Sequence, residues 1–113
     1  MPVVKTIFDP AETAVFSPIT ADQEPAIAAA DGLRLIGWTA TEAGGTGATA
    51  EVHLIHGETV AGGTELESIK FAGDESKHSW QWPGVRADNG ISIEVVDGEV
   101  DIEIYYLVLP IDR

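Results

Sequence analysis

The sequence has 113 residues, with 6 lysines and arginines against 19 aspartates and glutamates, for a formal net charge of −13. A chain of this length with 44% apolar and 22% charged residues is expected to form one small folded domain, because it is too apolar for disorder. The charge argues against a nucleic-acid partner, which needs clustered cations, and the absence of cysteine excludes disulfides and thiolate metal sites.

No segment approaches the ~20 apolar residues that span a bilayer. The amino terminus also lacks the basic and apolar regions of a signal peptide. We therefore expect no membrane partner.

The first twenty residues differ from the rest of the chain because three prolines interrupt them. Pro2, Pro10 and Pro18 interrupt two short extended pieces, residues 3–8 and 14–20. Proline cannot donate a backbone hydrogen bond to a sheet, so the pieces suit an edge strand or an extended segment laid over a neighbour. We predict an N-terminal arm over residues 1–20 and a folded domain over residues 21–113.

The centre of the chain holds four segments typical of strands, separated by turns rich in glycine: 33–40, 49–56, 64–71 and 78–82. Residues 25–30 are rich in alanine but short, and we expect an extended lead-in rather than a helix. An odd step from Leu66 to Ile69 breaks the two-residue period and predicts a bulge near Glu67.

The runs 91–96 and 99–104 alternate apolar and polar residues on either side of Asp97-Gly98. Asp-Gly suits the two central positions of a type I′ turn, which predicts a β-hairpin. Pairing around that turn sets the apolar residues against one another: Val95 with Val100, Ile93 with Ile102 and Ile91 with Ile104. About eight short strands in all indicate an all-β fold, an antiparallel β-sandwich or jelly roll with an extended N-terminal arm.

The predicted hairpin has an acidic outer face, on which Glu94 lies opposite Asp101, with Glu99 and Glu103 beside them. Like charges opposed across a sheet are destabilising. A solvated face is the ordinary explanation. The alternative is that these carboxylates meet basic residues of a partner or hold a calcium ion.

The clearest ligand signal is the pair Trp80 and Trp82, which alternate with polar residues on one strand. Two indoles on one face can form a platform on which sugar rings stack. The alternative is that both pack in the core or at a subunit interface, where an indole contributes a large buried area.

Other chemistry has little support in the sequence. An odd separation places His53 and His56 on opposite faces of one strand, so with His78 they are expected to be ordinary surface histidines. No nucleophile, zinc-protease or nucleotide-binding motif occurs. We therefore expect no enzymatic activity, no metal site and no cofactor.

Over about the last eighty residues, glycines at expected turns alternate with apolar segments expected to be strands. The elements of this layout are Leu33-Arg34-Leu35-Ile36-Gly37-Trp38 with Glu42, Val52-His53-Leu54 with Gly57, Gly62-Gly63 before Leu66 and Ile69, Gly84-Val85, Asn89-Gly90-Ile91, Gly98, and Tyr105-Tyr106. This layout resembles small β-sandwich structural proteins of tailed bacteriophages, of the capsid decoration or cement type.

The resemblance implies a non-enzymatic virion protein, made in the host cytoplasm, that stabilises the head by binding the capsid exterior where capsomers meet. The implied partners are the major capsid protein and other copies of the chain in a homotrimer. The arm residues expected to reach a neighbour's sheet edge are Val3, Val4, Ile7 and Phe8. Two alternatives stay open: a carbohydrate-binding β-sandwich module with Trp80 and Trp82 as its platform, and a phage tail or head-tail connector subunit.

Overall fold

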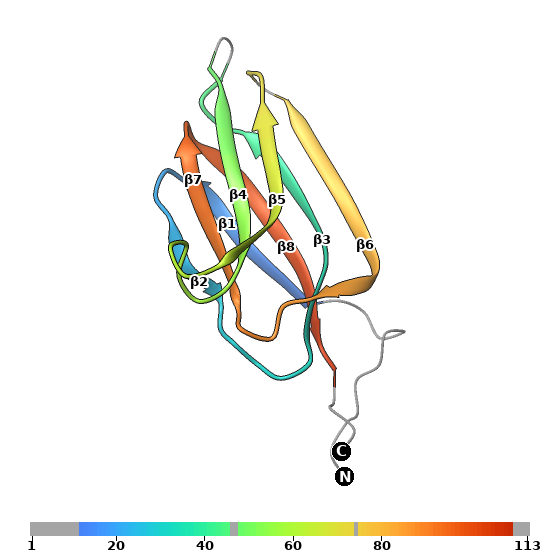
Figure 1. Ribbon diagram of the computed structural model, residues 1–113. Helices are drawn as coiled ribbons and strands as arrows, with labels where there is room; N and C mark the ends of the chain where they lie inside the picture. The colour runs from blue at the N-terminus through green and yellow to red at the C-terminus, as the bar shows by residue number, and fades with distance from the viewer. Residues whose placement is uncertain (1–11, 46–47, 74, 110–113) are drawn as a thin grey trace.

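The computed structural model describes residues 12–45, 48–73 and 75–109, without the side chains of residues 81–83. These residues form eight strands, which pair antiparallel in two four-stranded sheets (Figure 1). The described chain includes no helix of the length and apolarity needed to cross a membrane. The all-β class predicted from the sequence is therefore confirmed.

We call the two sheets A and B. Sheet A has the order β1 (Glu12–Ile19), β8 (Val100–Val108), β3 (Leu33–Glu42) and β6 (Ser76–Arg86). Sheet B has the order β2 (Gln23–Ile27), β7 (Ile91–Asp97), β4 (Ala50–His56) and β5 (Thr64–Phe71). The chain changes sheet at every connection except the one from β4 to β5.

Both sheets turn a row of apolar residues inward, and the two rows meet in one core. Side chains alternate between the faces of a strand, so a strand with every second residue apolar buries one face and exposes the other. In β4, for example, Val52 and Leu54 are fully buried, whereas His53 between them faces outward. Ile102 and Ile104 of β8 reach the same core from sheet A.

The predicted hairpin over residues 91–104 is wrong, because β7 and β8 lie in different sheets. Strand β7 pairs with β2 and β4, and β8 pairs with β1 and β3. The connection at Asp97-Gly98 therefore carries the chain from one sheet to the other. Alternation does not distinguish the two arrangements, because the apolar rows of β7 and β8 meet in the core either way.

Gly98 is explained by its surroundings in this connection. Its φ is +74°, and an added Cβ would lie 2.2 Å from the carbonyl oxygen of Thr49, just before β4. A side chain is therefore excluded both by the backbone conformation and by close approach. Gly98, which suggested a type I′ turn, is instead part of the connection that carries the chain from sheet B to sheet A.

The other predicted strands are present. Segments 33–40, 49–56, 64–71 and 78–82 correspond to β3, β4, β5 and part of β6. The predicted bulge is confirmed, because neighbouring residues Leu54 and Ile55 pair with Glu67 and Glu65 and leave Leu66 without a partner in the register.

The second piece of the predicted arm forms an edge strand. Residues 12–19 are β1, which pairs with β8 at the margin of sheet A. Three of the four edge strands contain a proline, as expected where no further strand is to be added: Pro18 in β1, Pro25 in β2 and Pro83 in β6. The proposed partner-binding residues Val3, Val4, Ile7 and Phe8 lie outside the described residues.

Candidate functional site

The outer face of sheet A carries a grid of side chains that the strand register sets. Three rows cross the sheet: Thr13, Tyr105, Gly37 and Trp80; Val15, Glu103, Thr39 and His78; and Asp101, Thr41 and Ser76. Ser17 of β1 extends the third row through a hydrogen bond to Asp101. This face combines exposed aromatic, hydroxyl and carboxylate groups.

Trp80 and Tyr105 form an aromatic pair on this face. Their ring centroids are 5.2 Å apart, and their planes differ by 14°, which is an offset-stacked arrangement. Gly37 of β3 lies in the same row, and a Cβ added there would come within 3.0 Å of the Trp80 ring and 2.5 Å of the Ser79 carbonyl oxygen. The missing side chain at Gly37 therefore leaves room for the indole to lie across β3 toward Tyr105.

The indole of Trp80 is also open to solvent, with 61% of the residue's surface exposed. An aromatic ring of this size is usually much more buried, because its burial contributes strongly to stability. An exposed and positioned indole is therefore a signal of ligand binding.

A groove of about 300 Å³ runs over β8, between β1 and β3. Its outward-facing lining residues come from three strands: Val15 and Ser17 of β1, Thr39 and Thr41 of β3, and Asp101 and Glu103 of β8. The volume lies at the lower end of the range for small-molecule sites.

Hydrogen bonds hold the polar groups of the groove in place. The Ser17 hydroxyl donates to Asp101 Oδ1 at 2.6 Å. The Tyr105 hydroxyl donates to Glu103 Oε2 at 2.8 Å, and the Tyr105 hydroxyl oxygen lies 3.3 Å from Thr39 Oγ1. Tyr105 therefore links the aromatic pair to the carboxylate of the groove.

No lysine, arginine or histidine among the described residues forms an ion pair with Asp101 or Glu103. Each carboxylate accepts one hydroxyl hydrogen bond and has lone pairs left for further donors. The groove is therefore negatively charged and rich in hydrogen-bond acceptors.

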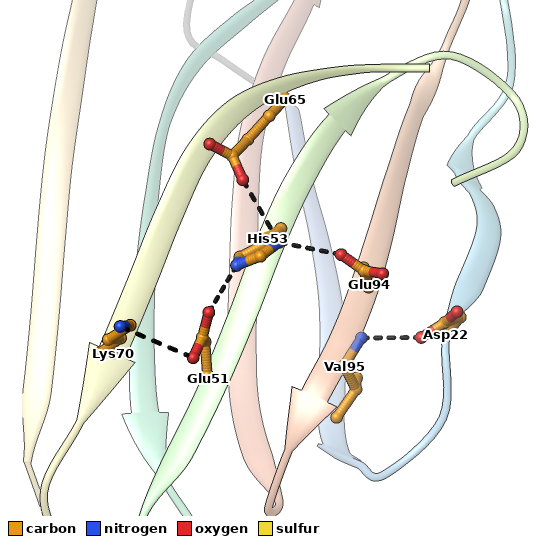
Figure 2. A network of polar contacts seen from close by, with 7 residues as sticks. All are labelled: Asp22, Glu51, His53, Glu65, Lys70, Glu94 and Val95. Atoms are coloured by element: carbon orange, nitrogen blue, oxygen red, sulfur yellow. Dashed lines mark hydrogen bonds and ion pairs between the residues drawn. The ribbon is translucent and has the colours of Figure 1, made fainter. Parts of the chain in front are cut away.

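A second polar cluster lies on the outer face of sheet B, centred on His53 (Figure 2). His53 Nε2 lies 2.7 Å from Glu51 Oε2 on the same strand. His53 Nδ1 lies 2.9 Å from Glu94 Oε1 of β7 and 3.3 Å from Glu65 Oε1 of β5. We call these four residues the His53 cluster; it connects the three strands β4, β5 and β7.

The carboxylates of the His53 cluster raise the pKa of His53 above its ordinary value. Burial acts in the opposite direction and lowers the pKa, because the imidazolium loses hydration. Hydrogen bonds to Glu51 and Glu94, with the negative charges of Glu65 and Glu51, outweigh that loss. Both ring nitrogens face carboxylate oxygens, an arrangement that is satisfied when both carry a proton. The cluster therefore stabilises the association of the three strands through attraction between His53 and the carboxylates.

The acidic face predicted from the sequence does not exist as one surface. Glu94 faces outward from sheet B, in the His53 cluster, whereas Asp101 and Glu103 line the groove on sheet A. Glu99 lies in the connection between them, where its carbonyl oxygen accepts the Ala43 N–H. The separation follows from the crossing at Asp97-Gly98. Within residues 12–45, 48–73 and 75–109, no three histidine, aspartate or glutamate side chains are placed to hold a metal ion.

The predicted indole pair is only partly described, because the side chain of Trp82 lies outside the described residues. The ring beside Trp80 is Tyr105, which the sequence prediction missed. Alternation with Asp101 and Glu103 could have placed Tyr105 on the same outer face, but the hairpin prediction gave no reason to bring β6 near it.

No protein-family model, curated protein or solved structure matches this chain. The fold and the site together define a two-sheet, all-β protein with an acidic groove and an exposed aromatic pair on the outer face of one sheet.

Proposed function

We propose that this protein is a non-enzymatic carbohydrate-binding β-sandwich module whose ligand lies in the groove of sheet A. The observation that carries the proposal is Trp80, a residue that is 61% exposed and whose indole is stacked against Tyr105. The apolar C–H face of a sugar ring packs on an exposed aromatic ring, while its hydroxyls need hydrogen-bond partners around the edge.

The groove supplies those partners beside the rings. The Asp101 and Glu103 carboxylates accept hydrogen bonds from sugar hydroxyls, and the Thr39 and Thr41 hydroxyls both donate and accept. The hydrogen bonds from Ser17 and Tyr105 already orient the two carboxylates, so little conformational entropy is lost on binding.

The same geometry favours binding over hydrolysis. Glycosidases use two carboxyl groups that flank the scissile bond from opposite sides. Asp101 and Glu103 stand two residues apart on the same face of β8, so both approach a bound sugar from the same side. The groove's described lining contains no histidine, lysine or cysteine that could act as base or nucleophile.

A glycan array tests this proposal, with Trp80→Ala as the informative variant. The control variant is Val96→Ala, which removes an exposed apolar side chain from sheet B. We expect the intact protein to bind a subset of glycans and Trp80→Ala to bind them at least about tenfold more weakly. Val96→Ala should bind like the intact protein. Binding that survives the Trp80 change, or no binding to any glycan, would contradict the proposal.

A capsid decoration protein of tailed bacteriophages is the second candidate function, favoured by the layout of residues 33–106. Under this proposal the chain is a jelly roll with an N-terminal arm over residues 1–20 and assembles as a homotrimer on the capsid exterior. Glu12, the first residue of β1, pairs with Tyr106 near the end of β8. Strand β1 therefore begins at that end of the sandwich, and under this proposal the major capsid protein binds there.

Deletion of residues 1–11 tests the decoration proposal and leaves β1 intact. We expect the shortened protein to fold and to lose its occupancy on capsids, since the arm would supply the multivalent contact. Unchanged occupancy would contradict the proposal. Light scattering of the intact protein separates a trimer from the larger ring expected of a connector subunit.

A further inference from the structure

We infer that the groove of sheet A selects amino sugars, with a protonated amine held by Asp101 and Glu103 and a neighbouring ring packed on Trp80 and Tyr105. This inference rests on the proposed carbohydrate-binding function and names the ligand class. Three features of the groove carry it: carboxylates that form no ion pair with a described residue, a described lining without lysine or arginine, and a position beside the aromatic pair.

The first feature is the charge of the groove. Asp101 and Glu103 both line it, and neither has a cationic partner within the described residues. A hydrogen bond from an ammonium to a carboxylate is roughly twice as strong as one between neutral groups. A sugar amine is the group on a carbohydrate that supplies such a donor.

The second feature is that the groove disfavours acidic sugars. A uronate or sialate carboxylate placed there would face two negative groups, and no lysine or arginine lines the described groove. The net charge of −13 adds repulsion at longer range. Selection therefore acts by repulsion of anions as well as by attraction of amines.

The third feature is spacing along β8. Alternate residues of a strand are about 7 Å apart, so Asp101, Glu103 and Tyr105 span about 14 Å along one face. Tyr105 contacts both Trp80 and Glu103. A ring on the aromatic pair therefore has its neighbour in the oligosaccharide over the carboxylates.

Calorimetric titration of the full chain with three tetrasaccharides tests the inference. The probes are β-1,4-linked glucosamine, its N-acetylated form and a galacturonate oligomer, compared at about pH 6, above the ordinary range of carboxyl groups. The first two differ at the nitrogen, which is a charged ammonium in glucosamine and a neutral acetamide in the acetylated form. We expect glucosamine to bind at least about tenfold more tightly than the acetylated form, as one charge-assisted hydrogen bond predicts, and galacturonate not to bind.

The double variant Asp101→Asn/Glu103→Gln keeps both hydrogen-bond acceptors and removes both charges. It should reduce the preference for the amine to within about twofold and leave binding of the acetylated sugar unchanged. The control is Glu58→Gln/Asp97→Asn, which removes two charges from the side of sheet B and should retain the preference.

The outcomes separate the two proposals. Equal binding of the amine and acetylated sugars by the intact protein overturns the amino-sugar inference and leaves the proposed function standing. Loss of the preference in the control variant also overturns it, because the effect would then come from overall charge. If none of the three oligosaccharides binds and the glycan array also gives no binding, both the carbohydrate-binding function and the amino-sugar inference are overturned.

Discussion

The His53 cluster makes the stability of the protein depend on pH in a defined direction. The pKa of His53 is raised in the folded protein, so the folded state binds more protons than the unfolded state between the two pKa values. The contribution of His53 to stability is therefore fully present below its unfolded pKa, about 6.5, and is lost as pH rises through its folded pKa. Above it, neutral His53 no longer offsets the charges of Glu51, Glu65 and Glu94.

The variant His53→Gln isolates this contribution, because glutamine keeps a polar side chain and cannot be protonated. His53 has two close carboxylate contacts, at 2.7 and 2.9 Å, to side chains that are 24% and 33% exposed. Charge-assisted hydrogen bonds discounted for this solvent exposure contribute about 1–2 kcal/mol in total. We expect His53→Gln to lower the free energy of unfolding by about that amount at about pH 5.5 and by much less at about pH 9.

Urea denaturation of both proteins across this pH range measures the difference directly, and the subtraction removes the pH effect of the other carboxylates. His78→Gln is the matched control, since His78 is exposed on β6, away from the cluster. At about pH 5.5 it should lower the free energy of unfolding by less than His53→Gln does, because His78 makes none of the contacts of the His53 cluster. A difference between wild type and His53→Gln that stays constant, or grows as pH rises, would refute the reasoning.

Three further predictions concern packing. Gly37→Ala should displace the Trp80 ring and cost about 1–3 kcal/mol, because its Cβ would lie 3.0 Å from that ring and 2.5 Å from the Ser79 carbonyl oxygen. Gly98→Asn should be destabilising by a similar amount of about 1–3 kcal/mol, although a type I′ turn would tolerate asparagine. Ile102→Ala should cost about 2–5 kcal/mol because it empties a core position, against less than about 0.5 kcal/mol for Val96→Ala at the surface.

Urea denaturation measures all three, with tryptophan fluorescence as a second reading for Gly37→Ala. Unchanged fluorescence and stability in Gly37→Ala would contradict the described placement of the indole. Full stability of Gly98→Asn would favour the hairpin over the crossing between sheets. Similar losses of unfolding free energy for Ile102→Ala and Val96→Ala would contradict the placement of Ile102 in the core.

Local patterns in the sequence predicted most of the strands. Alternation of apolar and polar residues identified β4, β7 and β8, and the broken period at Leu66 identified the bulge in β5. These features depend on neighbours along the chain, so they can be found without knowing which strands pair.

Pairing between strands was not predictable from the same patterns. The segments that become β7 and β8 satisfy alternation equally in a hairpin and across a core, and the glycine between them suits both. The wrong pairing placed Glu94 opposite Asp101, whereas in the structure Glu94 lies beside His53 on the outer face of sheet B. The aromatic pair was missed for the same reason. Tyr105 lies beside Trp80 only because the strand order is β8-β3-β6.

Chemical-shift mapping by NMR tests the carbohydrate-binding groove most directly. During titration with a glycan that the array selects, the Trp80 indole N–H and the backbone amides of Asp101, Glu103 and Tyr105 should shift together. The chemical shifts of the amides around His53 on sheet B should not change, because these amides lie on the opposite outer face of the sandwich. Chemical-shift changes confined to sheet B would contradict the assignment of the groove as the site. So would binding of the glycan without a change in the chemical shift of the Trp80 indole N–H.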